Sequence, residues 1–243
     1  METIKGQTCI ITGASSGIGR ASAFALAEQG VNLVLTARRE ERLKEICHKC
    51  ETKGVKAVYH AGDAVEESTA EAVVKLALNT FGRIDMLLSN AGIGIYKPFL
   101  ETTMEDYDRL MNTNVRSSYA FLLHTVPVMV RNGGGQIIIV SSVTGMIGAA
   151  EETAYTATKF ANRGMAQSLN KEFRSYGLRV TCLEPSCIYT EFEMGNGRTE
   201  EQMERKKETT LSAEDLAEAV VYTFTRRPGI RVMEMYLAGM QGD

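Results

Sequence analysis

A glycine-rich turn, Thr12-Gly13-Ala14-Ser15-Ser16-Gly17-Ile18-Gly19, follows the apolar run Cys9-Ile10-Ile11 near the start of this 243-residue chain. The pattern predicts a strand, a tight turn and a helix. In such a turn, backbone N–H groups can approach a diphosphate at the helix N-terminus, where the helix dipole favours negative charge. We therefore expect a dinucleotide to be bound here by Gly13, Ser15, Ser16, Gly17, Ile18 and Gly19.

The rest of the chain alternates between short apolar runs and helical patterns. The strand candidates are Cys9–Ile11, Asn32–Thr36, Lys56–His60, Met86–Ser89, Gln136–Val140, Arg179–Leu183 and Met233–Leu237. Helices are expected over 17–29, 40–53, 68–81, 104–131, 153–176 and 212–226. Near-continuous apolar runs are typical of strands buried on both faces of a parallel sheet. The sequence thus predicts one α/β domain over residues 1–243, a Rossmann-type doubly wound sheet of seven mainly parallel strands with helices on both faces.

Composition and charge argue against several other classes of protein. The formal net charge of −3 gives no electrostatic reason to expect nucleic acid as a partner. No apolar stretch approaches the roughly 20 residues of a membrane span. The first seven residues are too few and too polar for a signal peptide. We therefore expect a cytoplasmic protein that binds neither nucleic acid nor a membrane.

The five cysteines predict reduced thiols, because an odd number does not suit a disulfide framework. Cys47 and Cys50 have the CxxC spacing of some zinc and redox sites. They fall inside a charged helical stretch, and His60 is the only nearby candidate for a further ligand. We expect solvent-side or half-buried thiols here, and no metal site.

The end of the second strand indicates which nicotinamide coenzyme is bound. An acidic residue there would bind the ribose hydroxyls of NAD, but Ala37 takes that place and Arg38 and Arg39 follow. Guanidinium groups pair with phosphate through a planar fork of donors, which favours NADP(H) over NAD(H). The alternative is that both arginines only begin a solvated helix. Asp63 follows the third strand and is placed to accept from the adenine amine, or is an ordinary turn aspartate.

A second group of polar residues indicates proton transfer. Tyr155 and Lys159 lie one helical turn apart on the same face. Free tyrosine has a pKa of about 10, and a nearby ammonium group lowers it. Tyr155 can then protonate a carbonyl oxygen as hydride arrives, or accept the proton in reverse. Taken alone, a pair with this spacing is usually exposed and polar.

Ser142 follows the strand Gln136–Val140, so its hydroxyl lies at the carboxyl edge of the sheet and can orient a substrate oxygen. Ser141 should point to the other side of that strand. Asn90, Ala91 and Gly92 close the fourth strand. Small residues there allow the backbone to pass beside a coenzyme, and Asn90 can join adjacent strand ends.

With these motifs the sequence resembles the short-chain dehydrogenase/reductase family over nearly all its length. Thr12, Gly13, Gly17 and Gly19 fit the family's coenzyme turn, and Ser89-Asn90-Ala91-Gly92 is similar to its Asn-Asn-Ala-Gly element. The resemblance implies that Tyr155 is the acid/base, that Lys159 lowers its pKa and binds the nicotinamide ribose, and that Ser142 orients the carbonyl.

The same resemblance implies further roles. Asn114 would hold a water in a proton relay from Lys159 to solvent. Pro185, Ile188 and Thr190 would pack on the nicotinamide and its carboxamide. The sequence departs from the family at Ser186 and Ser117, where glycine is usual.

The expected function is reversible, NADPH-dependent reduction of a ketone or other carbonyl compound to a secondary alcohol. The alternatives are an NAD-linked dehydrogenase of a sterol, sugar or hydroxy acid, and a catalytically silent NADP-binding regulator. Small bacterial-type reductases that act on 3-oxoacyl or 3-hydroxy-acid compounds provide the nearest resemblance.

Residues 186–211 are interpreted as a lid over the substrate. Family analogy predicts a homodimer or homotetramer that associates through the helices at 104–131 and 153–176.

Candidate residues for an apolar substrate pocket, which would otherwise be core, are Ile93, Ile95, Met146, Ile147, Phe192 and Met194.

Overall fold

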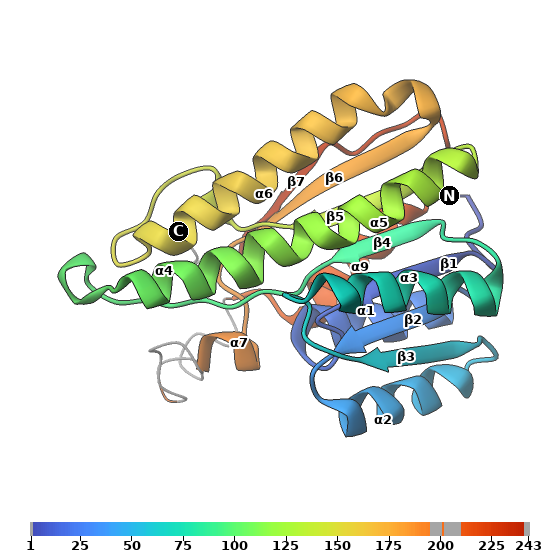
Figure 1. Cartoon of the computed structure of the whole chain (residues 1–243), viewed down its shortest axis with the longest axis horizontal. Coiled ribbons are helices and arrows are strands. Elements are labelled where there is room, and N and C mark those ends of the chain that lie inside the picture. Colours follow the sequence, from blue (N-terminus) through green and yellow to red (C-terminus); the bar gives the residue numbers. More distant parts are fainter. Residues whose placement is uncertain (1, 195–200, 202–209, 241–243) are drawn as a thin grey trace.

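The computed structural model describes residues 2–194, 201 and 210–240, and its centre is one seven-stranded sheet (Figure 1). The strands are β1 (Thr8–Thr12), β2 (Asn32–Ala37), β3 (Ala57–Ala61), β4 (Met86–Ser89), β5 (Gly135–Val140), β6 (Leu178–Pro185) and β7 (Glu234–Leu237). Their order is β3-β2-β1-β4-β5-β6-β7, and each neighbouring pair is parallel. This confirms the predicted doubly wound sheet. The order reverses between β1 and β4, where ligands bind in such sheets.

Helices cover both faces of the sheet (Figure 1). One face carries α1 (Gly17–Glu28), α2 (Glu40–Glu51) and α9 (Ala213–Phe224), and the other carries α3 (Glu67–Phe81), α5 (Ser117–Arg131) and α6 (Thr153–Glu172). Shorter elements are η1 (Phe99–Glu101), α4 (Met104–Leu110), η2 (Met111–Arg116), η3 (Val143–Gly145), η4 (Arg174–Tyr176) and α7 (Glu191–Met194). In the described part of the chain, no helix is long and apolar enough to cross a membrane. A cytoplasmic location stays a prediction.

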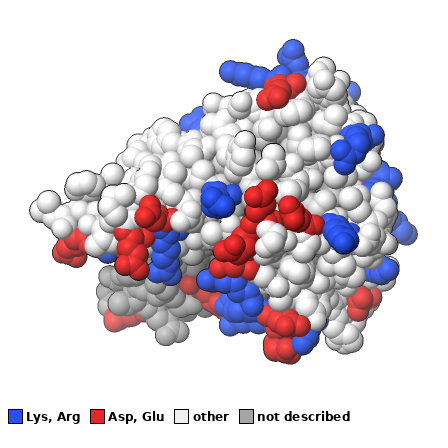
Figure 2. Space-filling view, in the orientation of Figure 1, with Lys and Arg blue, Asp and Glu red and all other residues white. Residues whose placement is uncertain are grey.

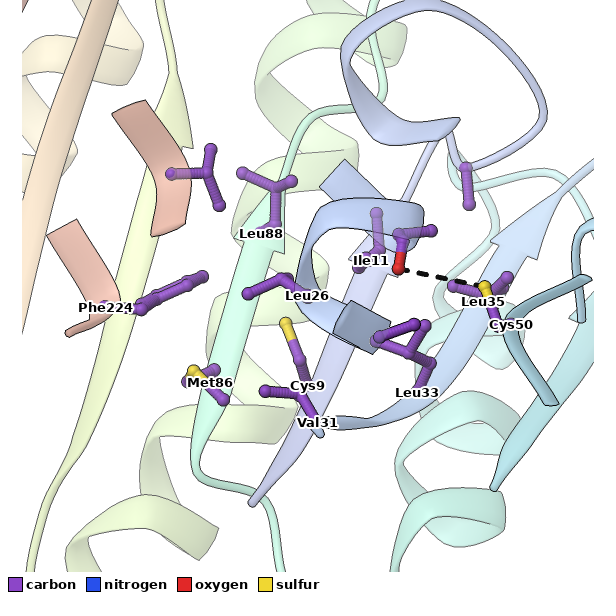
Figure 3. Packing of buried hydrophobic residues seen from close by; sticks show 14 of the residues in the cluster. Cys9, Ile11, Leu26, Val31, Leu33, Leu35, Cys50, Met86, Leu88 and Phe224 are labelled. Carbon is purple, nitrogen blue, oxygen red and sulfur yellow. Dashed lines mark hydrogen bonds between the residues drawn. The ribbon is translucent and has the colours of Figure 1, made fainter. Parts of the chain in front are cut away.

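Two apolar clusters hold the helices against the sheet. Side chains alternate along a strand, so Cys9 and Ile11 of β1 belong to one cluster and Ile10 to the other. Figure 3 shows the first cluster, in which Leu26 of α1 and Phe224 of α9 lie over the strands. Burial on both faces explains why the strands are near-continuous apolar runs.

The helix predicted over 104–131 is not one regular α-helix. It begins as α4, passes through the π-helical segment η2 and continues as α5. The Ser117 and Ser118 hydroxyls donate to the carbonyls of Thr113 and Asn114. Such local hydroxyl bonds compete with regular helix geometry, and π segments are frequent at functional sites. The segment carries Asn114, one of the predicted site residues.

Other element boundaries differ from the predictions by a few residues. The helix predicted over 153–176 ends at Glu172, and a 3-10 turn takes its last residues. The start of the final helix is confirmed, because Ser212 and Asp215 form a reciprocal capping box.

The prediction that Cys47 and Cys50 are solvent-side or half-buried is wrong. Both are buried on the inner face of α2, at 5% and 0% exposure, because their spacing places them beside Leu43 and Ile46. The Cys50 thiol donates to the Ala23 carbonyl of α1. Burial raises the pKa of each thiol to about 12. No disulfide joins any of the five cysteines, all of which lie in the described part of the chain.

The predicted lid at 186–211 is described only in part. Residues 195–200 and 202–209 lie outside the described residues. Of the rest, Ile188 forms an isolated parallel bridge with Leu211. This bridge brings both ends of the segment together beside β6, so its two described ends are anchored to the fold.

Candidate active site

A cavity of about 710 Å³ lies at the carboxyl ends of the parallel strands. Loops that follow six of the strands supply its lining. The predicted residues that line it are Gly13, Ser15, Ser16, Gly17, Ile18, Arg38, Arg39, Asp63, Asn90, Ala91, Gly92, Ser142, Tyr155, Lys159, Pro185, Ile188 and Thr190. Gly19 and Asn114 are not among the lining residues. Residues far apart in the sequence thus meet at one site, because parallel strands place their carboxyl ends at one edge.

The glycine turn between β1 and α1 has the geometry that a diphosphate requires. Gly13 and Gly17 have positive φ angles of 64° and 49°. A Cβ on Gly13 would lie 2.9 Å from the Asn90 amide nitrogen, and one on Gly19 would lie 2.5 Å from the Gly13 carbonyl oxygen. Gly19 therefore permits close packing behind the turn. No side chain caps α1, whose first backbone N–H groups remain available for phosphate oxygens.

Asn90 joins the ends of β1 and β4, as predicted. Its side-chain amide donates to the Thr12 carbonyl at 3.0 Å. In return, the Thr12 hydroxyl accepts from the backbone N–H groups of Asn90 and Ala91, each at 2.9 Å. These bonds fix the glycine turn against the β4 end, which holds the floor of the cavity rigid.

Arg39 reaches back from the end of β2 to the glycine turn. Its Nε donates to Ser15 Oγ at 3.0 Å and its Nη2 donates to Ser16 Oγ at 2.7 Å. Arg38 lines the same cavity. Two guanidinium groups and two hydroxyls therefore meet beside the turn, a donor set that suits a phosphate monoester.

Asp63 lines the cavity and also forms a local turn. Its Oδ1 accepts from the Val65 N–H at 3.1 Å. The turn interpretation is thus confirmed, and a contact with adenine stays a prediction.

Tyr155 and Lys159 project from α6 into the cavity wall. Both are nearly buried, at 6% and 5% exposure, so they are not the exposed polar pair that this spacing usually forms. Lys159 Nζ lies 5.3 Å from the centroid of the Tyr155 ring and donates to the Val140 carbonyl at 3.2 Å. Tyr96 packs edge-on against Tyr155, with 5.4 Å between ring centroids. The phenol is therefore held next to an ammonium group.

Burial lowers the pKa of Lys159 to about 8. The group is thus charged at neutral pH, but with less solvation than a surface lysine. A poorly solvated ammonium ion favours a nearby phenolate more strongly than an exposed one does. This is the electrostatic arrangement that an acid/base tyrosine requires.

Ser142 and Ser141 point in opposite directions at the end of β5, as predicted from strand alternation. Ser142 lines the cavity, and its hydroxyl accepts from the Thr144 N–H at 3.3 Å. Ser141 also contributes to the cavity wall, but its hydroxyl turns toward α6 and donates to the Lys159 carbonyl at 2.9 Å. Ser142 faces the ligand space, and Ser141 holds helix α6 in register.

Asn114 is fully buried and lies next to helix α6. Its amide nitrogen donates to the Ile93 carbonyl at 2.9 Å and to Thr158 Oγ1 at 3.0 Å, and its oxygen accepts from the Ile93 N–H at 2.8 Å. Asn114 therefore joins η2, the segment after β4 and helix α6. The water relay that the family resemblance implies stays a prediction.

Of the six apolar pocket candidates, the structure places Ile93 and Phe192 in the cavity wall. Ile95, Met146 and Ile147 are not among the lining residues, and the Ile147 side chain points outward with 70% exposure. The Met194 side chain lies outside the described part of the structure.

The sequence interpretation missed two residues that lie next to Arg39. Arg42 on α2 and Glu191 on α7 are joined by hydrogen bonds of 2.9 Å, and Glu191 also accepts from Arg39 at 2.9 Å. The separation of 149 positions between Arg42 and Glu191 explains why no local pattern predicted this pairing.

Outside the cavity, three possible metal ligands approach one another. Glu67, Glu71 and His124 bring donor atoms within 4.8 Å of one another. Both carboxylates are exposed, and exposed acidic groups often lie close together without an ion. We assign no metal to them.

Comparison with known proteins places the fold and this cavity in one family. The family model described as short chain dehydrogenase matches residues 7–201. The chain therefore belongs to the short-chain dehydrogenase family, and it is an oxidoreductase that acts on alcohol or carbonyl groups.

One curated relative and two solved structures illustrate the similarity. L-rhamnose 1-dehydrogenase (NAD(P)(+)) of Sphingomonas sp. strain SKA58 is 32% identical over 229 residues, which cover 91% of this chain and 90% of the relative. An alcohol dehydrogenase of the archaeon Thermococcus sibiricus, complexed with 5-hydroxy-NADP, has a TM-score of 0.87 and 28% identity over 96% of this chain and 97% of its own. L-sorbose reductase of Gluconobacter frateurii, complexed with NADPH and L-sorbose, has a TM-score of 0.89 and 27% identity over 98% of each chain.

Proposed function

We propose that this enzyme uses NADPH to reduce a ketone or other carbonyl compound to a secondary alcohol, and that it catalyses the reverse reaction with NADP⁺. The observation that carries the proposal is the convergence of the Tyr155 phenol, the Lys159 ammonium group and the Ser142 hydroxyl on one cavity. These are the groups needed to hold a carbonyl oxygen and to supply its proton.

In this proposal, each residue has one task. When bound, the reduced nicotinamide supplies a hydride to the carbonyl carbon. Ser142 donates a hydrogen bond that orients the substrate oxygen, and Tyr155 transfers its phenolic proton to that oxygen. Lys159 stabilises the phenolate that is left behind, and the phenol is then reprotonated from solvent. Asn114 positions α6 through Thr158, the residue before Lys159.

NADP(H) is the proposed coenzyme because cationic and hydroxyl donors gather beside the glycine turn. Arg39 already contacts Ser15 and Ser16, and Arg38 lines the same end of the cavity. The Thermococcus and Gluconobacter structures were solved with NADP-type coenzymes, which supports this choice. An NAD-linked sugar dehydrogenase is the second candidate, since the named relative from Sphingomonas acts on L-rhamnose with either coenzyme.

We further propose a homodimer or homotetramer. The outer faces of α5 and α6 run side by side across one surface of the molecule (Figure 1). Tyr119 and Leu123 on α5 and Phe160 on α6 are 45–59% exposed. Figure 2 shows few charged side chains over this part of the surface. An apolar face on two neighbouring helices suits burial against a second copy of the same face.

The test of the reaction is Tyr155→Phe. We expect this variant to bind NADPH as the wild type does and to lose roughly 100-fold or more in turnover, because it lacks the transferable proton. Initial rates on a panel of ketones and ketoses with NADPH or NADH measure turnover and coenzyme choice together. Tyr176→Phe, at an exposed tyrosine beyond the end of α6, is the matched control. Undiminished turnover of Tyr155→Phe would refute the proposed role.

A further inference from the structure

Glu191 places a carboxylate directly on the arginines at the adenosine end of the cavity. Its Oε2 accepts from Arg39 Nη1 at 2.9 Å, and both of its oxygens accept from Arg42 Nη1 at 2.9 Å. Glu191 is the first residue of α7, beyond the end of β6, whereas both arginines belong to the β2–α2 region. The ion pairs therefore join two segments on opposite sides of the cavity mouth.

The Arg39 guanidinium is the centre of this arrangement. Two of its nitrogens donate to Ser15 and Ser16, and the third donates to Glu191. Arg39, Ser15 and Ser16 are also the group to which the proposed function assigns the 2′-phosphate. The carboxylate of Glu191 and a 2′-phosphate would thus both accept hydrogen bonds from the Arg39 guanidinium group.

These ion pairs are weak enough to exchange with a ligand. The side chains of Arg39, Arg42 and Glu191 are 43%, 46% and 51% exposed. Ion pairs with this exposure contribute little to stability, on the order of 1 kcal/mol or less. A phosphate monoester carries close to two negative charges and three acceptor oxygens, so it competes well for the same donors.

We propose that Glu191 is a coenzyme-specificity residue: its carboxylate competes with the 2′-phosphate of NADP(H) for Arg39 and Arg42, and so limits the preference for NADP(H) over NAD(H). The inference rests on the proposed coenzyme. NAD(H) has no group that competes with Glu191, so the ion pairs remain intact when it binds. NADP(H) binds with one or both pairs broken, or with two anions close together.

The test is the binding of two coenzyme fragments to wild type and Glu191→Gln, measured by titration calorimetry without turnover. Adenosine 2′,5′-bisphosphate carries the 2′-phosphate, and adenosine 5′-monophosphate lacks it. We expect Glu191→Gln to bind the bisphosphate roughly 3- to 10-fold more tightly, as removal of one like charge in a solvated site predicts. Binding of the monophosphate should change less than about 2-fold, and added salt should reduce the difference for the bisphosphate.

Two further variants make the result specific. Glu41→Gln removes an exposed carboxylate from the same helix as Arg42, and Glu41 pairs with Lys44 instead. This variant should bind the bisphosphate and the monophosphate as the wild type does. It therefore distinguishes an effect of the Glu191 contact with the arginines from an effect of the protein's net charge. Arg39→Met should remove the preference for the bisphosphate. Because Glu191 and Glu41 are exposed, we expect neither glutamine substitution to destabilise the fold.

Two outcomes overturn the proposal in distinguishable ways. If the wild type prefers the bisphosphate and Arg39→Met removes that preference, but Glu191→Gln binds it no more tightly, Glu191 does not compete and the coenzyme assignment stands. If neither the wild type nor Glu191→Gln prefers the bisphosphate, and Arg39→Met changes nothing, the NADP(H) assignment fails and the inference fails with it.

Discussion

At the scale of the residue, Lys159 lies in an environment very different from that of a surface lysine. It is almost completely buried, yet it donates to the Val140 carbonyl and lies beside the Tyr155 ring. Desolvation lowers its pKa from 10.5 to about 8. The stability of the fold should therefore depend on pH in a window that this lysine defines.

The sign of that dependence follows from proton binding. Between about pH 8 and 10.5 the unfolded chain keeps the Lys159 proton and the folded chain has lost it. The free energy of unfolding should therefore rise with pH in this window, and the cost of burying the charge is present in full below pH 8. We expect the wild type to gain about 3 kcal/mol relative to Lys159→Met between pH 7 and 10.5.

Urea denaturation of both proteins at the two pH values measures this gain. Lys171→Met, which replaces an exposed lysine on the same helix, is the control. A stability difference between wild type and Lys159→Met that does not change with pH would contradict the assigned environment.

At the scale of the element, the π-helical segment η2 carries Asn114, which joins this segment to two others. Asn114 makes three hydrogen bonds, two to the backbone of Ile93 and one to Thr158. The exposed Asn112, two residues earlier in the same segment, is not part of this network. Two asparagines of one segment therefore differ in burial, with Asn114 inside the fold and Asn112 at the surface.

We expect Asn114→Ala to destabilise the fold by about 2–4 kcal/mol, because it leaves the part-buried backbone N–H and C=O groups of Ile93 without their partner. Asn112→Ala is the matched control and should change stability by less than about 0.5 kcal/mol. Thermal or urea unfolding measures both. Equal effects of the two substitutions would mean that the network around Asn114 does not brace α6.

At the scale of the whole molecule, the apolar faces of α5 and α6 form the surface through which we propose self-association. Leu123→Arg combined with Phe160→Arg should convert the oligomer to smaller species, because it places two like charges opposite their copies. Light scattering after size exclusion measures the mass. Leu100→Arg, at an apolar side chain in η1 that is 96% exposed, is the control. Unchanged mass in the double variant would exclude this face as the interface.

The local patterns of the sequence determined most of the fold. Apolar runs predicted seven strands, and stops such as Gly82, with its φ angle of 74°, predicted helix ends. Strand alternation also predicted the opposite directions of Ser141 and Ser142. These features depend on spacing within one element, which a sequence displays directly.

The tertiary structure decided what depends on contacts between distant segments. It buried Cys47 and Cys50, converted residues 111–116 to a π segment and joined Glu191 to Arg39 and Arg42. Each outcome depends on a partner from another element: α1 for the thiols, Ile93 and Thr158 for Asn114, and α7 for the arginines. Backbone propensities act over a few residues, whereas burial and ion pairing depend on which segments the fold brings together.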